Sequence, residues 1–238
     1  MHYVEDRVME TLLSETYQVV VDLGCGVGGS LRYLYPKYQA RYIGITISGF
    51  QAEQARRLLA SSASDTQIVH ANMLDVAHIV ASTTTRIRPI PERKLFFAIE
   101  SLIHLKSPDA MFSILGGVCQ KGDSLIIADD TLTRLPSRAE AMLTRRFVDG
   151  WHAPGLNLKA TLIRSATSFG FNLTHESNLT PYLELQRPRD RLLRLALPLL
   201  RRVGRRSSWV ESMNGGDALQ RGLLTGLIEY SLMCFERI

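Results

Sequence analysis

The sequence lacks the features that mark secreted, disulfide-bonded or membrane-spanning proteins. Its three cysteines, Cys25, Cys119 and Cys234, lie far apart and match no metal-ligand spacing, which favours a reducing compartment. No apolar run approaches the roughly 20 residues that cross a bilayer. The first residues, Met1–Asp6, lack the basic and then apolar pattern of a signal peptide. We therefore expect a soluble, cytoplasmic protein.

Acidic residues are scarce in one segment only. The net charge is +5, and most of the excess lies between Arg187 and Arg206, where Asp190 is the only acid. The rest of the chain is near neutral, so the composition does not indicate a nucleic-acid-binding domain. Three interpretations of the arginine segment stay open: a solvated amphipathic helix, contact with a phosphorylated substrate or a membrane surface, and a nucleic-acid footprint.

The order of apolar patterns predicts an α/β fold. Length alone suits one large domain, 1–238. β-type runs alternate with helical spacing, which favours a parallel sheet with helices on both faces. The predicted strands are Gln18–Leu23, Arg41–Thr46, Thr66–His70, Lys94–Ile99, Ser124–Ala128, Phe171–Glu176 and Leu227–Glu236. The predicted helices are Ser30–Tyr35, Gly49–Ala63, Asp109–Gln120, Arg138–Val148 and Lys159–Phe169.

The most informative stretch is a glycine-dense turn after the first predicted strand. Asp22 ends the strand, and Gly24-Cys25-Gly26-Val27-Gly28-Gly29 leads into a helical pattern. Glycines let the backbone approach a ligand where a Cβ would clash, and ligands of such sheets bind at the carboxyl ends of strands. No Gly-Lys-Ser/Thr follows, so a phosphate loop is excluded. The Asp-Leu-Gly-Cys-Gly-x-Gly order resembles the first motif of class I S-adenosylmethionine-dependent methyltransferases.

This resemblance implies a Rossmann-like, seven-stranded, mostly parallel sheet whose last strand is antiparallel. It implies S-adenosylmethionine as cofactor and S-adenosylhomocysteine as product. Segments 130–157 and 177–226 then become substrate-cap insertions. Family members usually carry a helical arm before the first strand, whereas Met1–Tyr17 allows one helix at most. Either 177–226 or a partner subunit, as in a homodimer, closes the site, or the true start lies upstream.

The resemblance also assigns cofactor-binding residues, at the ends of the first three strands. After the second strand, Gly-Ile-Thr-Ile-Ser-Gly-Phe-Gln resembles the variant found in tocopherol, sterol and cyclopropane-lipid methyltransferases. Ser48 is equally suited to be a helix N-cap. Asn72 stands where relatives often hold adenine with an acid, and Met73 suits the adenine ring, although an ordinary turn with a core methionine also fits. The assigned residues are Asp22, Gly24, Cys25, Gly26, Thr46, Ile47, Ser48, Gln51, Asn72 and Met73.

The fourth strand ends in Glu100-Ser101-Leu102-Ile103-His104, which resembles the Glu-Ser/Ala-x-x-His segment of the same small-molecule branch. Asp/Asn-Pro-Pro-aromatic and Pro-Cys motifs of nucleic-acid methyltransferases are absent. His104 could act as a general base, and Glu100 could orient it, stabilise a developing cation or contact the cofactor. A histidine that only contacts the backbone is the alternative. Asp129-Asp130 after the fifth strand has no third metal ligand with suitable spacing, so no metal is expected.

Substrate contacts fall in the last third. Trp151, His152 and Tyr182 are candidate substrate residues, although Tyr182 also suits an interfacial position. The function expected from the resemblance is methylation of a small apolar or amphiphilic metabolite, such as an isoprenoid, a quinol or a specialised metabolite, and C-, O- and N-methylation all stay open. The alternatives are an RNA or DNA methyltransferase that uses the arginine segment, and a non-catalytic adenosylmethionine-binding module.

Overall fold

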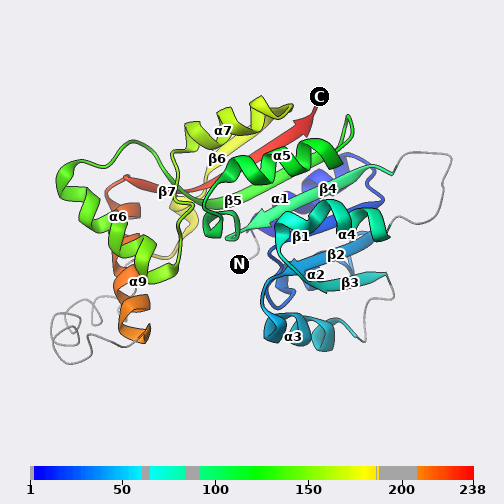
Figure 1. The fold of residues 1–238 in the computed structure, drawn as a ribbon, viewed down its shortest axis with the longest axis horizontal. Coiled ribbons are helices and arrows are strands. Elements are labelled where there is room, and N and C mark those ends of the chain that lie inside the picture. The colour runs from blue at the N-terminus through cyan, green and yellow to red at the C-terminus, as the bar shows by residue number, and fades with distance from the viewer. Residues whose placement is uncertain (1–2, 61–64, 84–91, 186, 188–207) are drawn as a thin grey trace.

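A computed structural model describes residues 3–60, 65–83, 92–185, 187 and 208–238. At its centre lies one seven-stranded sheet in the order β3-β2-β1-β4-β5-β7-β6 (Figure 1). β1 to β5 pair in parallel, and β7 runs antiparallel to both β5 and β6. The predicted fold class is confirmed. The strands are β1 (Val19–Leu23), β2 (Arg41–Thr46), β3 (Thr66–His70), β4 (Lys94–Ile99), β5 (Ser124–Leu132), β6 (Phe171–Asn178) and β7 (Ile228–Arg237).

Helices cover both faces of the sheet, because its central strands bury side chains on each side. In β1, Val19 and Val21 join a core with α4, α5 and α7, whereas Val20 joins the opposite core with α1, α2 and α3. Burying a side chain of this kind stabilises the fold by about 1.5–3 kcal/mol. The sheet is therefore a rigid base for the loops at its carboxyl edge. The helices are α1 (Tyr3–Ser14), α2 (Gly29–Leu34), α3 (Gly49–Leu59), α4 (Val76–Thr83), α5 (Pro108–Val118), α6 (Arg138–Trp151), α7 (Lys159–Ser168) and α9 (Ser208–Leu224).

Two elements around the sheet, α4 and β5, differ from the sequence-based expectation. α4 follows β3 where no helix was predicted, because its short run of β-branched residues resembles a strand or loop. β5 continues past Ala128 to Leu132, since β7 pairs with it along its whole length, so Asp129 and Asp130 lie within the strand. The predicted end of the second helix, 61–63, lies outside the described residues. None of the described helices is long and apolar enough to cross a membrane.

α6 and α9 form a separate lobe beside the β5–β7 end of the sheet (Figure 1). The two helices approach closely at glycines: a Cβ on Gly150 would lie 2.4 Å from the Glu211 carbonyl oxygen and 2.8 Å from the Gly215 Cα. Gly215 and Gly216 lie within α9, and the structure places both glycines against Trp151. Phe147 and Leu223 are buried in this lobe with the start of β7. One helix of the lobe, α6, falls in the segment 130–157, and the other, α9, falls in the segment 177–226.

A Gly150→Ala variant is expected to be less stable by about 1–3 kcal/mol, because the added methyl meets the backbone of α9, which cannot move aside without repacking the lobe. Thermal unfolding of both proteins measures this difference. Gly117→Ala in α5 is the matched control: a Cβ there meets nothing within 4 Å, so the substitution should be neutral or stabilising. An equal thermal midpoint for Gly150→Ala would contradict the tight helix crossing.

Candidate active site

The glycine turn lies at the carboxyl end of β1 and leads into α2. Gly24, Gly26 and Gly28 have positive φ values of 101°, 53° and 81°, a region that favours glycine. The amides of Gly24 and Cys25 both donate to the Ile45 carbonyl, each at 2.9 Å, so the turn is held against β2. The thiol of Cys25 is buried, which raises its pKa. The sequence motif therefore forms a fixed bend of backbone.

Two of these glycines are required for different reasons. A Cβ on Gly24 would lie 2.4 Å from the Cβ of Ser101, so packing within the protein excludes any larger residue there. A Cβ on Gly26 would meet nothing within 4 Å among the described residues. The backbone at Gly26 therefore borders open space. This is the arrangement that lets a ligand lie directly against main chain.

Asp22 lies just before this bend and is only 3% exposed. Among the described residues, no hydrogen bond to its side chain is found. Burial, and secondarily the negative charge of Glu5, raise the pKa of Asp22 well above its usual range. A positively charged group beside this carboxyl would offset the cost of its burial. Asp22 is therefore suited to bind an ammonium group of a ligand.

The end of β2 carries a set of interlocked polar side chains. The Thr46 hydroxyl donates to the Gln51 side-chain oxygen at 2.9 Å. The backbone N–H of Gln51 donates to the Ser48 hydroxyl at 3.3 Å. The predicted N-cap role of Ser48 on α3 is thus confirmed. Ile47, by contrast, is 74% exposed, which leaves an apolar surface next to the polar groups. These four residues lie at the end of β2, which is paired in parallel with β1 and so ends beside the glycine bend.

The end of β3 forms a short turn that faces the glycine bend. The Asn72 side-chain oxygen accepts the Leu74 amide at 3.0 Å and caps the short helix η1 (Met73–Asp75). The turn interpretation is therefore correct, and the amide oxygen keeps a second lone pair for a ligand. The Met73 Cε lies 3.5 Å from where a Cβ on Gly24 would be. Met73 is thus close enough to the bend to contact the same ligand.

The end of β4 lies between the glycine bend, at the end of β1, and the end of β5. Glu100 has a φ of 51°, a strained value for a residue other than glycine, and its amide donates to the Ala128 carbonyl at 2.8 Å. The hydroxyl of the next residue, Ser101, donates to the Leu23 carbonyl of β1. These contacts fix the backbone of Glu100 and Ser101 between the ends of β1 and β5.

His104 ends the short helix η2 (Leu102–His104), so Glu100 and His104 are brought to the same cavity by a 3₁₀ turn. The Nδ1 atom of His104 lies 2.9 Å from the His152 carbonyl oxygen, with which it can form a hydrogen bond as the Nδ1–H tautomer. The backbone-contact interpretation of His104 is therefore correct for one ring nitrogen. In that tautomer the other nitrogen is unprotonated and can accept a proton.

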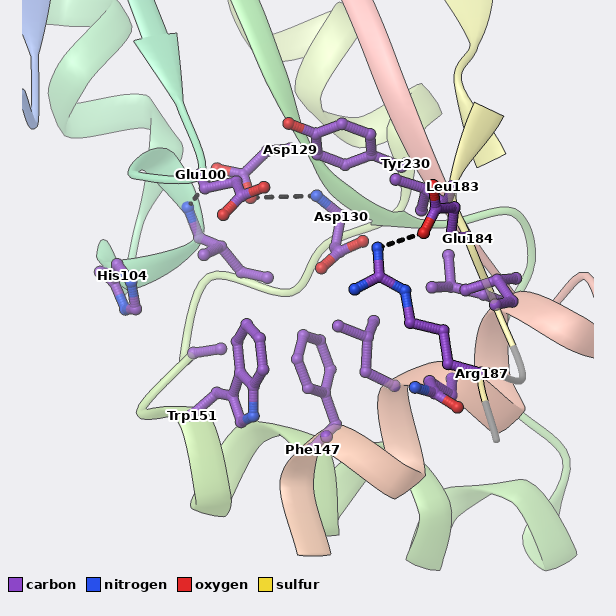
Figure 2. A pocket seen from close by; sticks show the side chains of 17 residues that line it. Glu100, His104, Asp129, Asp130, Phe147, Trp151, Leu183, Glu184, Arg187 and Tyr230 are labelled. Carbon is purple, nitrogen blue, oxygen red and sulfur yellow. Dashed lines mark hydrogen bonds and ion pairs between the residues drawn. The ribbon is translucent and has the colours of Figure 1, made fainter. Parts of the chain in front are cut away.

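A cavity of about 380 Å³ lies over the carboxyl ends of β4 and β5 and under α6 and α9. Figure 2 shows the carboxylates of Glu100, Asp129 and Asp130 along one side, and Phe147 and Trp151 opposite them. Burial is the main cause that raises the pKa of Asp129 to about 7 and of Asp130 to about 8. The cavity thus combines acid groups that titrate near neutrality with an aromatic wall.

Tyr230 on β7 is a site residue that sequence reasoning missed. It is 7% exposed, lies opposite Asp130 in the sheet register and lines the cavity. Burial, together with the charges of Glu100 and Asp129, raises the pKa of its hydroxyl, which therefore stays protonated. Alternation along the last predicted strand could have pointed to Tyr230. Its distance in sequence from the other site residues hid its role.

The predicted substrate residues are only partly brought together. Trp151 lines the cavity, and its indole N–H donates to the Ser212 carbonyl of α9 at 3.2 Å. His152 contributes its backbone carbonyl, and its side chain is not among the groups that line the cavity. Tyr182 stacks on Tyr3 with ring centroids 4.5 Å apart and lines a second cavity of about 300 Å³. Tyr182 is thus both an interfacial aromatic and a pocket residue.

Arg187 is the one member of the arginine segment that the structure describes, and it lines both cavities. Its guanidinium pairs with the Glu184 carboxylate at 2.5 Å (Figure 2). The rest of the segment, 188–206, lies outside the described residues. Within the described part of the chain, no group of three His, Cys, Asp or Glu side chains is arranged to hold a metal ion.

Comparisons with known proteins agree with this geometry. Residues 20–87, which contain the glycine bend and the ends of β2 and β3, match the family described as "Methyltransferase domain". The tocopherol O-methyltransferase of Arabidopsis thaliana is 33% identical over 52% of this chain and 33% of its own length. The 24-methylenesterol C-methyltransferase 2 of the same plant is 23% identical over 74% of this chain and 47% of its own length. The chain thus spans less than half the length of these curated relatives.

Solved structures share the fold across the whole chain. The geranyl diphosphate C-methyltransferase of Streptomyces coelicolor, solved with Mg²⁺, geranyl diphosphate and S-adenosylhomocysteine, has a TM-score of 0.69 at 18% identity and covers 100% of this chain and 82% of its own. The cyclopropane synthase MmaA2 of Mycobacterium tuberculosis has a TM-score of 0.68 at 16% identity, covering 97% and 84%. Residues 20–87 thus match the methyltransferase-domain family, and the chain has the fold of these solved structures.

Proposed function

We propose that this chain transfers a methyl group from S-adenosylmethionine to a small apolar or amphiphilic molecule and releases S-adenosylhomocysteine. The observation that carries the proposal is the open backbone bend at Gly26 and its link to the acid-lined cavity through the end of β4: Ser101 packs against Gly24 of the bend, and the preceding residue, Glu100, lines the cavity. A cofactor along the first three strand ends and an acceptor in the cavity would meet at Glu100. This adjacency is what a direct transfer between two bound molecules requires.

The residues around the bend fit the cofactor. Asp22, which is buried and has no hydrogen-bond partner for its side chain among the described residues, suits the ammonium group of the methionine part, and the bend Gly24-Cys25-Gly26 lets that part lie against main chain. The β2 end, with Thr46, Ile47, Ser48 and Gln51, offers hydrogen-bonding groups beside an apolar surface for the ribose and methionine side. Asn72 and Met73 would contact adenine through an amide oxygen and a thioether. When bound, the cofactor supplies an electrophilic methyl group on a sulfonium.

On the acceptor side, the protein's contribution is positioning, water exclusion and proton removal. Phe147, Trp151 and the α9 leucines exclude water from the acceptor. His104 accepts a proton from the acceptor through its free ring nitrogen, while the His152 carbonyl fixes the ring. Glu100 stabilises positive charge that develops as the methyl group moves, and it lies close enough to the bend to contact the cofactor as well.

The proposed substrate class is supported by the molecules that the names of relatives and structural neighbours specify. Their names specify tocopherol, a methylenesterol and geranyl diphosphate, and one neighbour, a mycolic acid cyclopropane synthase with a TM-score of 0.69, was solved with S-adenosylhomocysteine and CTAB. These molecules are apolar or amphiphilic, as are the cavity walls here. Their variety supports an isoprenoid, a quinol or a specialised metabolite over RNA or DNA, and C-, O- and N-methylation remain alternatives.

The lobe of α6 and α9 would act as the cap within a single methyltransferase domain, 1–238. Segments 130–157 and 177–226 would supply it, as the cavity walls from both helices suggest. Contact with a membrane surface or with a phosphorylated acceptor would use the segment from Arg187 to Arg206, and a homodimer partner would be a second source of closure. A metal is not part of this proposal.

Calorimetric titration with S-adenosylhomocysteine, followed by incubation with methyl-labelled cofactor and a metabolite extract, tests the proposal. We expect saturable one-to-one binding and label in a small, extractable product. Label in RNA or DNA, with affinity that falls steeply with salt, would favour the nucleic-acid alternative. Cofactor binding without any transferred label would favour a non-catalytic module. Absence of binding would contradict the cofactor site itself.

A His104→Ala variant should keep its affinity for S-adenosylhomocysteine and lose about 10²–10⁴-fold in turnover, the usual contribution of a general base. Calorimetry and the labelled-methyl assay separate the two quantities. His175→Ala, an exposed histidine on β6 outside the cavity, is the matched control and should leave both unchanged. Undiminished turnover in His104→Ala would remove His104 from the mechanism.

A further inference from the structure

The cavity carries more negative charge than the single carboxylate, Glu100, to which the proposed methyl transfer gives a role. Its lining includes four carboxylates and, among the described residues, one guanidinium. That guanidinium, on Arg187, pairs with the Glu184 carboxylate at 2.5 Å, so it neutralises the acid nearest to it. The acids without a cationic partner in the described structure are Glu100, Asp129 and Asp130.

Asp129 and Asp130 lie on neighbouring positions of β5 but have different surroundings. Asp129 is 3% exposed and accepts the Ile103 amide at 2.9 Å and the Asp130 amide at 3.0 Å. The Asp130 carboxylate has no hydrogen bond within the described residues, and Figure 2 shows it pointing into the cavity. Burial raises the pKa of both groups, and the negative charge of Glu100, with that of Asp129 in the case of Asp130, raises it further. The cavity would therefore be stabilised by a positive charge placed in it.

The rest of the lining suits a cation attached to an apolar body. Trp151 and Phe147 present aromatic rings opposite the carboxylates, and Tyr230 adds a ring beside the carboxylates (Figure 2). The faces of such rings attract cations. Leu219 and Leu223 of α9 and Ile103 of η2 extend this wall with aliphatic groups. Carboxylates on one side and rings on the other form the pairing that proteins use for amines and quaternary ammonium groups.

We propose that the acceptor of this enzyme is a cationic amphiphile: a molecule with an amine or ammonium group, held by Glu100, Asp129 and Asp130, on an apolar body that packs against α6 and α9. The inference rests on the proposed function, because it identifies the substrate class of the same cavity. An anionic acceptor would face repulsion from the same three acids. A neutral one would leave their charges without a partner.

Binding of three probes with the same twelve-carbon chain tests the proposal: dodecyltrimethylammonium, dodecyl sulfate and dodecyl maltoside, each below its micelle concentration. The chain has two tryptophans, so the fluorescence of Trp151 is isolated in a Trp209→Phe background. We expect the cationic probe to bind at least about tenfold more tightly than either of the others, since a single cation beside a buried carboxylate gains that much. Equal affinities, or a preference for the sulfate, would overturn the proposal.

Substitutions at Asp130 test whether the preference for the cationic probe arises from the cavity. Asp130→Asn keeps the shape and removes the charge, and we expect it to reduce the cationic preference at least about fivefold, whereas Asp130→Glu retains it. Asp149→Asn, an exposed acid on α6 that does not line the cavity, changes the net charge equally and should have no effect. An equal loss in Asp149→Asn would mean that the probe senses overall charge, which would also overturn the proposal.

The affinity for the cationic probe should also rise with pH through about 7 to about 8, where the two aspartates lose their protons. A bound cation lowers their pKa, so binding should release protons, which the buffer dependence of the calorimetric enthalpy measures. The other titratable groups facing the probe are Glu100, His104, Glu184, Arg187 and Tyr230.

Titration with S-adenosylhomocysteine in the same proteins keeps the two proposals distinct. Cofactor binding without a preference for the cationic probe contradicts this inference alone. A preference for the cationic probe without cofactor binding contradicts the proposed function alone.

Discussion

A Gly26→Val variant is expected to bind S-adenosylhomocysteine at least about 100-fold more weakly than the parent, a loss of about 2.7 kcal/mol. The reason is the position of the new side chain. It would project into the open space that borders the bend, where the methionine part of the cofactor is proposed to lie. A branched side chain there would hold the ligand away from the main chain. Calorimetry with both proteins measures the difference.

Gly226→Val provides the control that this prediction needs. Gly226 also has a positive φ, 68° against 53° for Gly26, and a Cβ there also meets nothing within 4 Å. Both variants therefore carry similar backbone strain without a clash, and both should show a similar fall in thermal midpoint. Only Gly26→Val should lose cofactor. If its affinity stays within about threefold of the parent, a change under about 1 kcal/mol, the bend is not the cofactor site.

The parts of the site that sequence alone could predict are those encoded by local motifs. Asp22 to Gly28 form the bend where the apolar run and the glycines indicated it, because buried strands and positive φ values leave a direct signature in residue type. Ser48 caps α3, as its position before a helical pattern predicted. Such features depend on neighbours in the chain, so a single sequence contains them.

The acceptor side could not be predicted in the same way, since it is made by residues that are far apart in sequence. Tyr230 meets Asp130 only because β7 inserts between β5 and β6, and this pairing also extends β5 past Ala128. Gly215 favours a turn by its own propensity, but close packing with Gly150 overrides that preference and allows α9. The cavity, and with it its excess of carboxylates, therefore becomes visible only in three dimensions.

A Glu100→Gln variant is expected to lose about 10²–10⁴-fold in turnover while its affinity for S-adenosylhomocysteine changes less than about fivefold. The amide keeps the size of the side chain and one acceptor oxygen, so contacts to a bound cofactor are largely retained. The lost negative charge lines the cavity and is next in sequence to Ser101, which packs against the bend, so it lies where positive charge would develop during transfer. The labelled-methyl assay and calorimetry give the two quantities separately.

The strained backbone at Glu100 makes the choice of substitution and control important. Its φ of 51° is retained most safely by a residue of similar shape, and Gln meets that condition. Glu53→Gln on α3, where an exposed glutamate pairs with Arg57, removes the same charge away from the cavity and should leave turnover unchanged. If Glu100→Gln instead loses cofactor affinity and turnover in equal measure, Glu100 acts by holding the cofactor. Full activity in that variant would mean that the charge which assists transfer comes from Asp129 or Asp130, the other cavity carboxylates for which the described residues provide no cationic partner.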